Sequence, residues 1–291
     1  MPVRWSRTLP CEPSSVTVVL DSAGRYFASF VVQIDSTPLS PVDVETGIDL
    51  GLTHFAVLSN GRKVTNPRYL RNAERRLKRA QQALSRKHKG SANRAKARTR
   101  VARLHAKVRD TRRDFHHKLS TTIIRENQAV YVEDLAVAAP ARTRMAKSVH
   151  DAGWSAFVSM LEYKAARYGR TFGRINRWYP PSKLCSTCGA VTGKMPLHVR
   201  RWTCACGTTH DRDVNAAKNI LAAGRADRLN DYRAQTRPAP MPAALRSSNP
   251  PGPHTRQPGT PHLQTGEDVN RLDSPVGRSC SGLRPSCAPG R

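Results

Sequence analysis

The spacing of apolar residues predicts two β-strands near the start of the chain and two α-helices further along it. Residues 16–20 and 26–34 alternate in the period of strands around a turn at 21–24. Residues 69–87 and 101–123 instead carry apolar residues three and four positions apart, which is the narrow seam of a packed helix. A Lys-Gly-Ser break separates them, so we expect an antiparallel helical hairpin. The seam residues are Leu70, Ala73, Leu77, Ala80 and Leu84, then Val101, Leu104, Val108, Thr111, Phe115, Leu119 and Ile123.

Strand and helix patterns continue to alternate after the hairpin. Residues 129–132 and 171–178 are expected to form strands, and residues 151–168 between them are amphipathic, with Gly169 as a natural stop. This alternation predicts an α/β domain with a mixed sheet. From about residue 225 onward Pro, Gly, Ser and Arg dominate without periodicity, which predicts a disordered tail.

Residues 46–59 are an apolar and β-branched run that predicts one buried strand, followed by an Asn-Gly turn. Asp49 interrupts the run. A carboxylate in the middle of a buried strand is costly unless a metal or a cation pairs with it, although backbone amides at a strand end are another way to hold it. Gly47 and Gly51 flank it and leave room for another backbone or a ligand to come close.

The charge of the chain narrows the range of partners. Its 291 residues include 49 Lys and Arg against 21 Asp and Glu, a formal net charge of +28, which favours a polyanion such as nucleic acid. Residues 69–125 contain only three acids, so the hairpin is expected to contact a phosphate backbone. No apolar run approaches the roughly 20 residues of a membrane span and no signal peptide is visible at Met1. We therefore expect a cytoplasmic protein without a membrane partner.

Four of the seven cysteines cluster over residues 185–206, which in a reducing compartment indicates a metal before a disulfide. Cys185-Ser-Thr-Cys188-Gly is a metal knuckle, whereas Cys204 and Cys206 are one residue closer and need a puckered loop to share one zinc ion. Two ligand sets stay open, either all four cysteines in a weakened geometry or three cysteines completed by His210 or water. In both sets the zinc is expected to be structural, folding a loop of about twenty residues with little core of its own.

A third carboxylate follows the cysteines. Asp213 stands where a helix N-cap belongs, two residues after Asp211, and the helix is predicted to stop at Gly224. Taken alone, Asp213 is only a cap. Together with Asp49 and Glu133 it can converge at one end of the sheet, and three carboxylates are the oxygen ligands that two hard divalent cations need. The pattern predicts phosphodiester hydrolysis, in which one cation activates a water and the other stabilises the leaving oxygen.

Four short motifs occur in order along the chain: Gly-Ile-Asp-Leu-Gly at 47–51, Val-Glu-Asp-Leu at 132–135, Lys-Leu-Cys-Ser-Thr-Cys-Gly at 183–189, and Asp-Arg-Asp-Val-Asn-Ala-Ala-Lys-Asn at 211–219. With this order and spacing, roughly residues 14–224 resemble the RuvC-type nuclease core of the TnpB family. These are the OrfB proteins of bacterial insertion sequences, related to type V CRISPR effectors. The resemblance implies an α/β fold, an RNase H-like (RuvC) mixed sheet with an inserted basic helical hairpin and a zinc-ribbon insertion. It also implies a DNA endonuclease whose guide RNA comes from the transposon end.

The resemblance assigns roles to individual residues and ranges. It implies that Asp49, Glu133 and Asp213, with Asp211 as a further oxygen ligand, are catalytic and bind Mg²⁺ or Mn²⁺. Zn²⁺ is assigned to Cys185, Cys188, Cys204 and Cys206. The expected domains are a remnant of a wedge-type β domain (1–40), the nuclease core (41–182) with its hairpin (68–125), the zinc ribbon (183–210), the final RuvC helix (211–224) and the tail (225–291).

The chain departs from the family pattern in two ways. The family has Cys-x-x-Cys where this chain has Cys204-Ala-Cys206, and family members place a much longer stretch before the first catalytic aspartate than the 48 residues found here. Residues 16–34 therefore resemble the last part of the wedge domain of an N-terminally truncated member. A nucleic-acid-binding remnant or accessory transposase protein without catalysis is the alternative function, and a strand-transferring transposase is a third.

Overall fold

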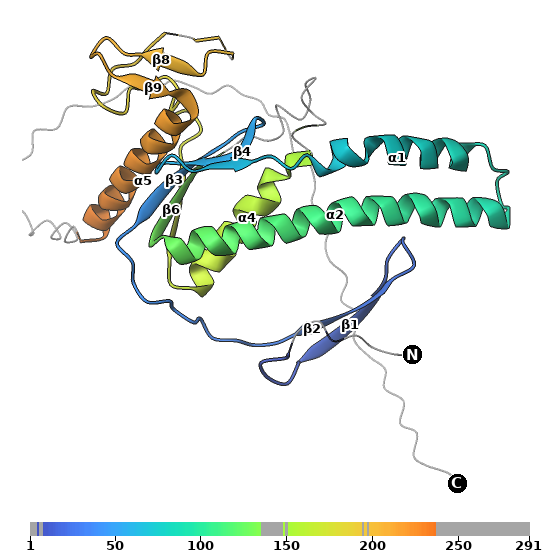
Figure 1. Ribbon diagram of the computed structural model, residues 1–291. Coiled ribbons are helices and arrows are strands. Elements are labelled where there is room, and N and C mark those ends of the chain that lie inside the picture. The colour runs from blue at the N-terminus through green and yellow to red at the C-terminus, as the bar shows by residue number, and fades with distance from the viewer. Residues whose placement is uncertain are drawn as a thin grey trace, which may run out of the picture. The chain divides into compact units, whose positions relative to one another are not determined.

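A mixed five-stranded β-sheet lies at the centre of the described chain (Figure 1). The computed structural model describes residues 5, 8–134, 148, 151–193, 195–196 and 198–236. The strands are β1 (Ser15–Leu20), β2 (Tyr26–Val31), β3 (Glu45–Leu50), β4 (His54–Leu58), β5 (Lys63–Thr65), β6 (Ala129–Glu133), β7 (Thr171–Ile175), β8 (Arg201–Thr203) and β9 (Thr209–Asp211). The helices are α1 (Tyr69–Ser85), α2 (Ala92–Glu126), α4 (Trp154–Arg167) and α5 (Arg212–Thr236).

The central sheet has the order β5-β4-β3-β6-β7. Strands β3, β4 and β5 form an antiparallel meander, whereas β6 and β7 run parallel to β3. This mixed sheet, with helices between its parallel strands, confirms the predicted α/β class and has the RNase H-like arrangement.

The prediction of one long strand over residues 46–59 is wrong. The chain reverses after Leu50, so that Asp49 pairs with Val57 on the antiparallel strand β4. Both strands are buried, and their composition is equally apolar on each side of the reversal, so periodicity alone does not reveal the break. The predicted Asn-Gly turn is confirmed one strand later, between β4 and β5, where Gly61 has a φ of 90°.

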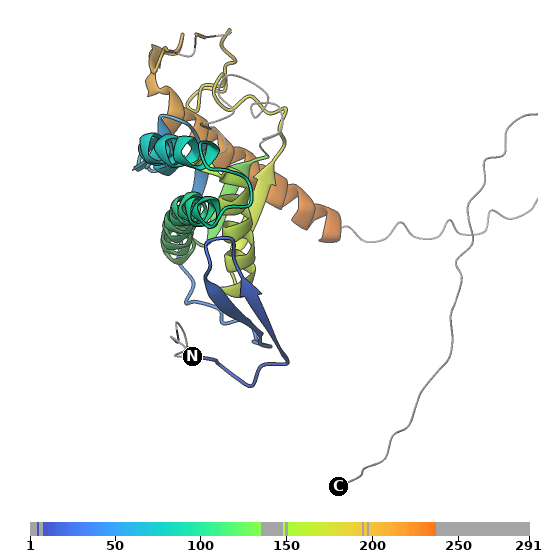
Figure 2. The same cartoon turned by 90° about the vertical axis from the view of Figure 1, so that its right-hand side faces the viewer.

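The two faces of the sheet are covered by different helices. Ile48, Val130 and Val132 point into the main core, which they share with residues of α2 and α4. Tyr131 and Ala129 point to the opposite face, where they pack with Ile220 of α5. Helix α5 runs across the sheet on this second face (Figure 2). Because side chains alternate along a strand, Asp49 lies on the α5 face between the core residues Ile48 and Leu50.

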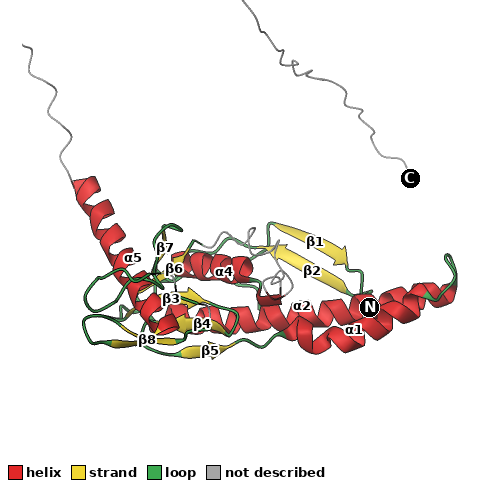
Figure 3. Cartoon of the chain, turned by 90° about the horizontal axis from the view of Figure 1, so that it is seen from above, coloured by secondary structure: helices red, strands yellow, loops and turns green. Residues whose placement is uncertain are grey.

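Helices α1 and α2 form the predicted antiparallel hairpin (Figures 1 and 3). Leu77 and Ala80 of α1 and Val108 and Leu119 of α2 are buried, as the seam requires. Thr111 was predicted to belong to the seam but is exposed, and its hydroxyl donates to the carbonyl of Lys107 at 2.6 Å. A threonine can satisfy its own hydroxyl on the helix backbone, so its position in the pattern did not require burial.

The β1–β2 hairpin lies beside α2 and outside the central sheet (Figures 1 and 3). Arg25 in its turn donates to Asp110 of α2 at 2.7 Å, and Arg103 of α2 donates to the carbonyl of Ala23. Polar contacts at one end therefore hold this hairpin, while most of the apolar side chains of its two strands remain exposed.

The prediction that the last helix stops at Gly224 is wrong, because α5 continues to Thr236. Gly224 is buried against Tyr131, and a Cβ at this position would lie 2.1 Å from the tyrosine ring. The glycine therefore permits close packing inside the helix and does not end it. The predicted disordered tail is thus helical over its first twelve residues, 225–236, and residues 237–291 lie outside the described part. None of the described helices has the length and apolar composition of a membrane span.

Candidate active site

Helix α5 runs antiparallel to β3, and two contacts define their alignment. At the start of the strand, Glu45 accepts a hydrogen bond from Arg225 at 2.5 Å. In the middle of the strand, Gly47 touches the helix backbone so closely that a Cβ there would lie 2.2 Å from the carbonyl oxygen of Ala217. The room that Gly47 leaves next to Asp49 is therefore filled by α5. The start of α5 consequently lies at the end of β3.

Three of the predicted carboxylates come together at this end of the strand. Asp49 lies two residues beyond the glycine, and Asp213 lies one helical turn before the alanine that the glycine contacts. Glu133 joins them from β6, because the parallel register pairs Ile48 with Val132 and the next residues on the two strands are the two acids. A strand, its parallel neighbour and a helix N-terminus thus each contribute one carboxylate.

The electrostatics of this cluster reflect the proximity of its acids. Burial, and after it the charges of Asp213 and Glu133, raise the pKa of Asp49 from 3.8 to about 7. Burial also raises the pKa of Glu133, with a further contribution from Asp134. Within the described residues, the side-chain carboxylates of Asp49 and Glu133 receive no hydrogen bond and form no ion pair. Half-buried carboxylates without such partners are stabilised when a cation lies between them.

The three acids do not close around a single ion. Among the described His, Cys, Asp and Glu residues, only a cysteine cluster brings three or more ligand atoms within 4.8 Å of one another. The carboxylates therefore frame a wider space at the sheet edge. Such a space is compatible with two cations that also bind water and phosphate oxygens.

The structure gives the two aspartates at the start of α5 different environments. Asp211 is the N-cap, because its carboxylate accepts the backbone N–H of Val214 at 3.1 Å, and it also accepts a hydrogen bond from Lys63. Burial opposes these bonds, but they hold the pKa of Asp211 below its ordinary value. The interpretation of Asp213 as the cap is wrong, since it lies inside the first turn. Asp213 is the one whose charge acts on Asp49.

Arg200 is a site residue that the sequence analysis missed. It precedes β8 and donates to Asp213 at 3.2 Å and to Thr53 in the β3–β4 turn at 3.2 Å. It therefore connects the cysteine-bearing segment to the sheet edge. One arginine among many carries no local signal of this role, which depends on the approach of two distant segments. His54 Nδ1 lies 3.9 Å from the other oxygen of Asp213.

The four predicted cysteines lie together with all their sulfurs within 4.8 Å. The Cys185–Cys206 and Cys188–Cys204 sulfur pairs are 3.8 and 3.6 Å apart. Four sulfurs about 2.3 Å from a central zinc ion would be about 3.8 Å from one another in a tetrahedron. The spacing of this cluster therefore suits a tetrahedral metal ion.

The shortened cysteine pair adopts the puckered turn that its spacing requires. Gly207 follows Cys206 with a φ of 84°, and the N–H of Cys204 donates to the carbonyl of Thr208 at 2.9 Å. The hydroxyl and backbone N–H of Thr208 are the main cause that lowers the pKa of Cys206 to about 6. His210 does not belong to the group of four; its Nε2 lies 3.0 Å from the sulfur of Cys185.

Two buried asparagines on α5 attach the first cysteine knuckle to the helix, and the sequence analysis missed both. Asn215 donates to the carbonyl of Leu184 at 2.7 Å and accepts the N–H of Ser186 at 2.9 Å. Asn219, one turn later, donates to Leu184 and to Pro181. Two asparagines four residues apart on the inner side of a helix are a detectable signal, because a buried amide needs partners.

Two family models match consecutive parts of the chain. The OrfB model of IS605-type elements, described as "Probable transposase", matches residues 29–144, and the model of the Cas12f1-like TNB domain matches residues 154–220. A solved Cas12f1–sgRNA–target DNA complex has 19% identity and a TM-score of 0.46, covering 67% of this chain and 41% of the Cas12f1 chain.

Curated relatives agree with these models. A "Putative RNA-guided DNA endonuclease" from Streptomyces pristinaespiralis is 54% identical over 77% of this chain and 56% of its own length. The relative named InsQ from Escherichia coli (strain K12), described in the same words, is 32% identical over 78% of this chain and 60% of its own. The chain thus spans less than two thirds of the length of these relatives. The sequence matches show that the chain belongs to the TnpB/OrfB family.

Proposed function

We propose that this protein is a metal-dependent DNA endonuclease of a transposable element, with Asp49, Glu133 and Asp213 as its catalytic carboxylates. One observation carries the proposal: the three acids converge at the sheet edge, and the pKa of Asp49 rises to about 7 beside the other two. Carboxylates with raised pKa values, such as those of Asp49 and Glu133, are typical of catalytic sites. The basic hairpin α1–α2 supplies a surface for the phosphate backbone.

The donor set fits Mg²⁺ or Mn²⁺, because hard divalent cations take oxygen ligands and tolerate open positions for water. Asp49, Glu133 and Asp213 would hold the ions between them. When bound, such ions supply an activated water and stabilise a leaving oxygen during phosphodiester hydrolysis. The chain itself contributes the fixed position of Asp213, which Arg200 and the capped start of α5 hold toward the strand.

Asp211 has a structural part in this proposal. Its capping bond to Val214 and its pair with Lys63 orient the helix that carries Asp213. The environment of Asp211 thus favours Asp213 as the essential ligand of the two.

We propose zinc for the cysteine cluster, with Cys185, Cys188, Cys204 and Cys206 as ligands and His210 as a hydrogen-bond partner of Cys185. Zinc ions of this kind stabilise small loops that lack a core. The domain division follows from these assignments. It comprises a wedge-type hairpin before residue 41, a RuvC-like core with its helical hairpin, the zinc ribbon over residues 183–210, and a last helix that runs past residue 224 to 236.

We further propose that a guide RNA from the transposon end directs DNA cleavage. Two observations support it: the relatives are described as putative RNA-guided DNA endonucleases, and this chain has a strongly basic composition. DNA and RNA are accordingly its proposed partners.

The test compares the two aspartates of α5. Asp213→Ala should abolish Mg²⁺- or Mn²⁺-dependent nicking of DNA while binding in EDTA stays within a few-fold. Asp211→Ala should keep most of the activity and lose about 1 kcal/mol of stability through the missing cap. Asp49→Ala and Glu133→Ala should behave like Asp213→Ala. If wild-type protein binds DNA tightly but never nicks it with either metal, the chain is a binding protein without catalysis and the nuclease proposal is wrong.

A further inference from the structure

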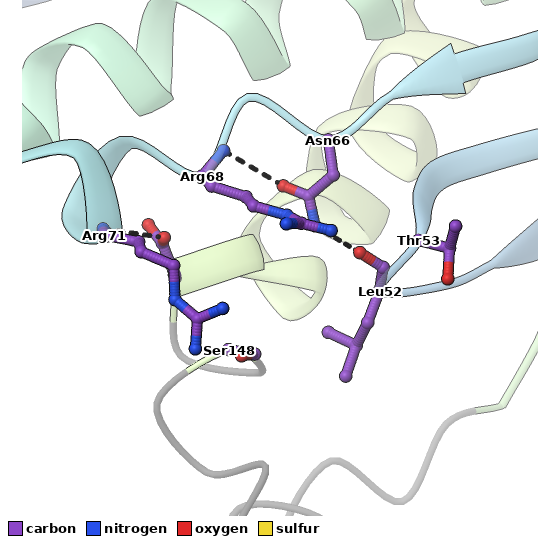
Figure 4. Close-up of a pocket in the computed structure, with 7 residues that line it drawn as sticks. Leu52, Thr53, Asn66, Arg68, Arg71 and Ser148 are labelled. Atoms are coloured by element: carbon purple, nitrogen blue, oxygen red, sulfur yellow. Dashed lines mark hydrogen bonds between the residues drawn. The ribbon is translucent and has the colours of Figure 1, made fainter.

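A small pocket of about 130 Å³ opens between the β3–β4 turn and the start of α1 (Figure 4). Its lining is polar and basic, and it consists of Leu52, Thr53, Asn66, Arg68, Arg71, Ser148 and Asp151. Figure 4 shows the guanidinium of Arg68 extending over Asn66 toward Leu52, and that of Arg71 extending toward Ser148. Two guanidiniums thus lie on its walls.

The guanidinium groups of the two arginines can donate hydrogen bonds to an anion. Neither guanidinium has a hydrogen-bond or ion-pair partner within the described residues. The acid that lines the same pocket, Asp151, is occupied by backbone groups, since its two oxygens accept the N–H groups of Leu70 and Arg71 at 2.8 and 3.3 Å. The pocket therefore presents ten N–H donors from two arginine side chains, which have no direct carboxylate partner among the described residues, and this favours an oxyanion.

The position of Arg68 is held by the backbone at an energetic cost. It has φ 47° and ψ 48°, and it is the one non-glycine residue with a positive φ in the described chain. Asn66 fixes this conformation by accepting the N–H of Arg68 at 3.2 Å while donating to the carbonyl of Leu52 at 3.1 Å. A glycine would adopt the same conformation with less strain. The strain is explained if the side chain of Arg68 is needed.

The pocket is adjacent to the carboxylate cluster. Its wall residue Thr53 and the carboxylate of Asp213 are both 3.2 Å from nitrogens of one guanidinium, that of Arg200. Because the guanidinium has a fixed size, the hydroxyl oxygen of Thr53 and the carboxylate oxygen of Asp213 lie within about 9 Å of each other. That distance spans about one or two phosphates along a nucleic-acid strand.

We propose that this pocket binds a backbone phosphate of the DNA strand, one or two nucleotides from the phosphodiester at the proposed catalytic carboxylates. Arg68 and Arg71 would donate to the phosphate oxygens, and Asn66 would hold Arg68 in place. The inference rests on the proposed nuclease function for the identity of the strand. It adds a positioning site that sets where along the strand cleavage occurs, since a fixed phosphate fixes its neighbours.

The test measures binding in EDTA, where metal-dependent cleavage does not contribute. The probe is a single-stranded DNA oligonucleotide in which one phosphate at a time is replaced by a neutral methylphosphonate. Wild-type protein should bind about tenfold more weakly when the substitution falls on the phosphate in the pocket. Arg71→Ala should bind unmodified DNA about tenfold more weakly, and it should lose its sensitivity to substitution at that one position.

Arg79→Ala is the matched control, since Arg79 is exposed on the same helix and lies outside the pocket. It should weaken binding equally at every substituted position. If the effects of Arg71→Ala and of the methylphosphonate are additive at all positions, the pocket holds no particular phosphate and the proposal is wrong. The proposal is also wrong if the position-specific effect appears with an RNA oligonucleotide and is absent with DNA. If the effect is found but no cleavage occurs in Mg²⁺, the pocket stands and only the nuclease proposal fails.

Arg68→Gly separates binding from folding. Glycine relieves the left-handed strain, so the melting temperature should not fall, whereas DNA binding should weaken about as much as in Arg71→Ala. Arg68→Lys should retain part of the affinity because it keeps the charge. Arg68→Gly with wild-type affinity and wild-type response to the methylphosphonate series would show that the side chain does not contact the strand, and would overturn the proposal.

Discussion

Gly47→Ala should separate the proposed catalytic carboxylates Asp49 and Asp213, because it acts on the contact that sets the distance between β3 and α5. A Cβ at this position would lie 2.2 Å from the carbonyl oxygen of Ala217 and 2.4 Å from the backbone nitrogen of Leu221. Observed Cβ contacts are essentially never shorter than 3.0 Å. Both opposing atoms belong to a helix backbone, so no side chain can rotate away. The helix must move outward by several tenths of an ångström or more.

This movement of the helix should lower both the stability of the protein and its rate of DNA cleavage. Overpacking at a buried backbone contact costs about 3 kcal/mol, which for a chain of this size lowers the melting temperature by about 6–12 °C. The displaced helix also carries Asp213 away from Asp49. A misplacement of about 1 Å in a catalytic group can lower the rate about 100-fold.

The assay is thermal denaturation together with DNA nicking at a temperature well below the melting point of the variant, so that unfolding does not contribute to the rate. Gly193→Ala is the control, since a Cβ there has no atom within 4 Å. A variant Gly47→Ala with wild-type stability would refute the close contact. A variant that is destabilised but nicks at the wild-type rate would refute the claim that this contact positions Asp213.

Four further predictions concern the carboxylate cluster and the cysteine cluster. Because a proton and a cation compete for Asp49, Mn²⁺ affinity measured by titration should fall about tenfold per unit as the pH drops below about 7, and a pH-independent affinity would contradict its raised pKa. The same raised pKa means that the metal-free fold binds an extra proton between about pH 4 and 7, so its stability should decrease as the pH rises through that window. Asn215→Ala should lose metal from the cysteine cluster to a chelator faster than wild type, whereas the exposed control Lys218→Ala should not; equal rates would exclude the asparagine attachment. Metal analysis should find about one zinc per chain, and Cys204→Ser should reduce it strongly, while zinc-free protein purified without chelator would exclude the site.

Local patterns were sufficient to predict most elements. The helical hairpin, the strand that ends on Glu133 and the α4 helix each have the apolar period of their structure, and each was found near its predicted limits. These elements bury one side on a neighbour, so the sequence must carry the period whatever the partner is. The candidate catalytic and metal-binding residues could also be identified from the sequence, because a carboxylate within an apolar strand and a cluster of cysteines are both unusual.

Errors occurred where two long-range alternatives produce the same local pattern. Residues 46–59 have the composition of a buried strand whether they form one strand or two, and the reversal after Leu50 is stabilised by pairing with β4. A glycine such as Gly224 can either end a helix or permit a close contact inside it. Here it permits close packing against the ring of Tyr131, a residue distant in sequence.

The sequence by itself determined which residues could do chemistry: the aspartates, Glu133 and the four cysteines, because their residue types and spacing restrict them to few roles. Only the tertiary structure decided which role each of these residues can have. Asp211 and Asp213 are two residues apart and chemically identical, and they differ because Lys63 and the N–H of Val214 bind one while Asp49 and Arg200 face the other. Such differences arise from the approach of segments far apart in the chain, and the local sequence around each residue does not encode its distant neighbours.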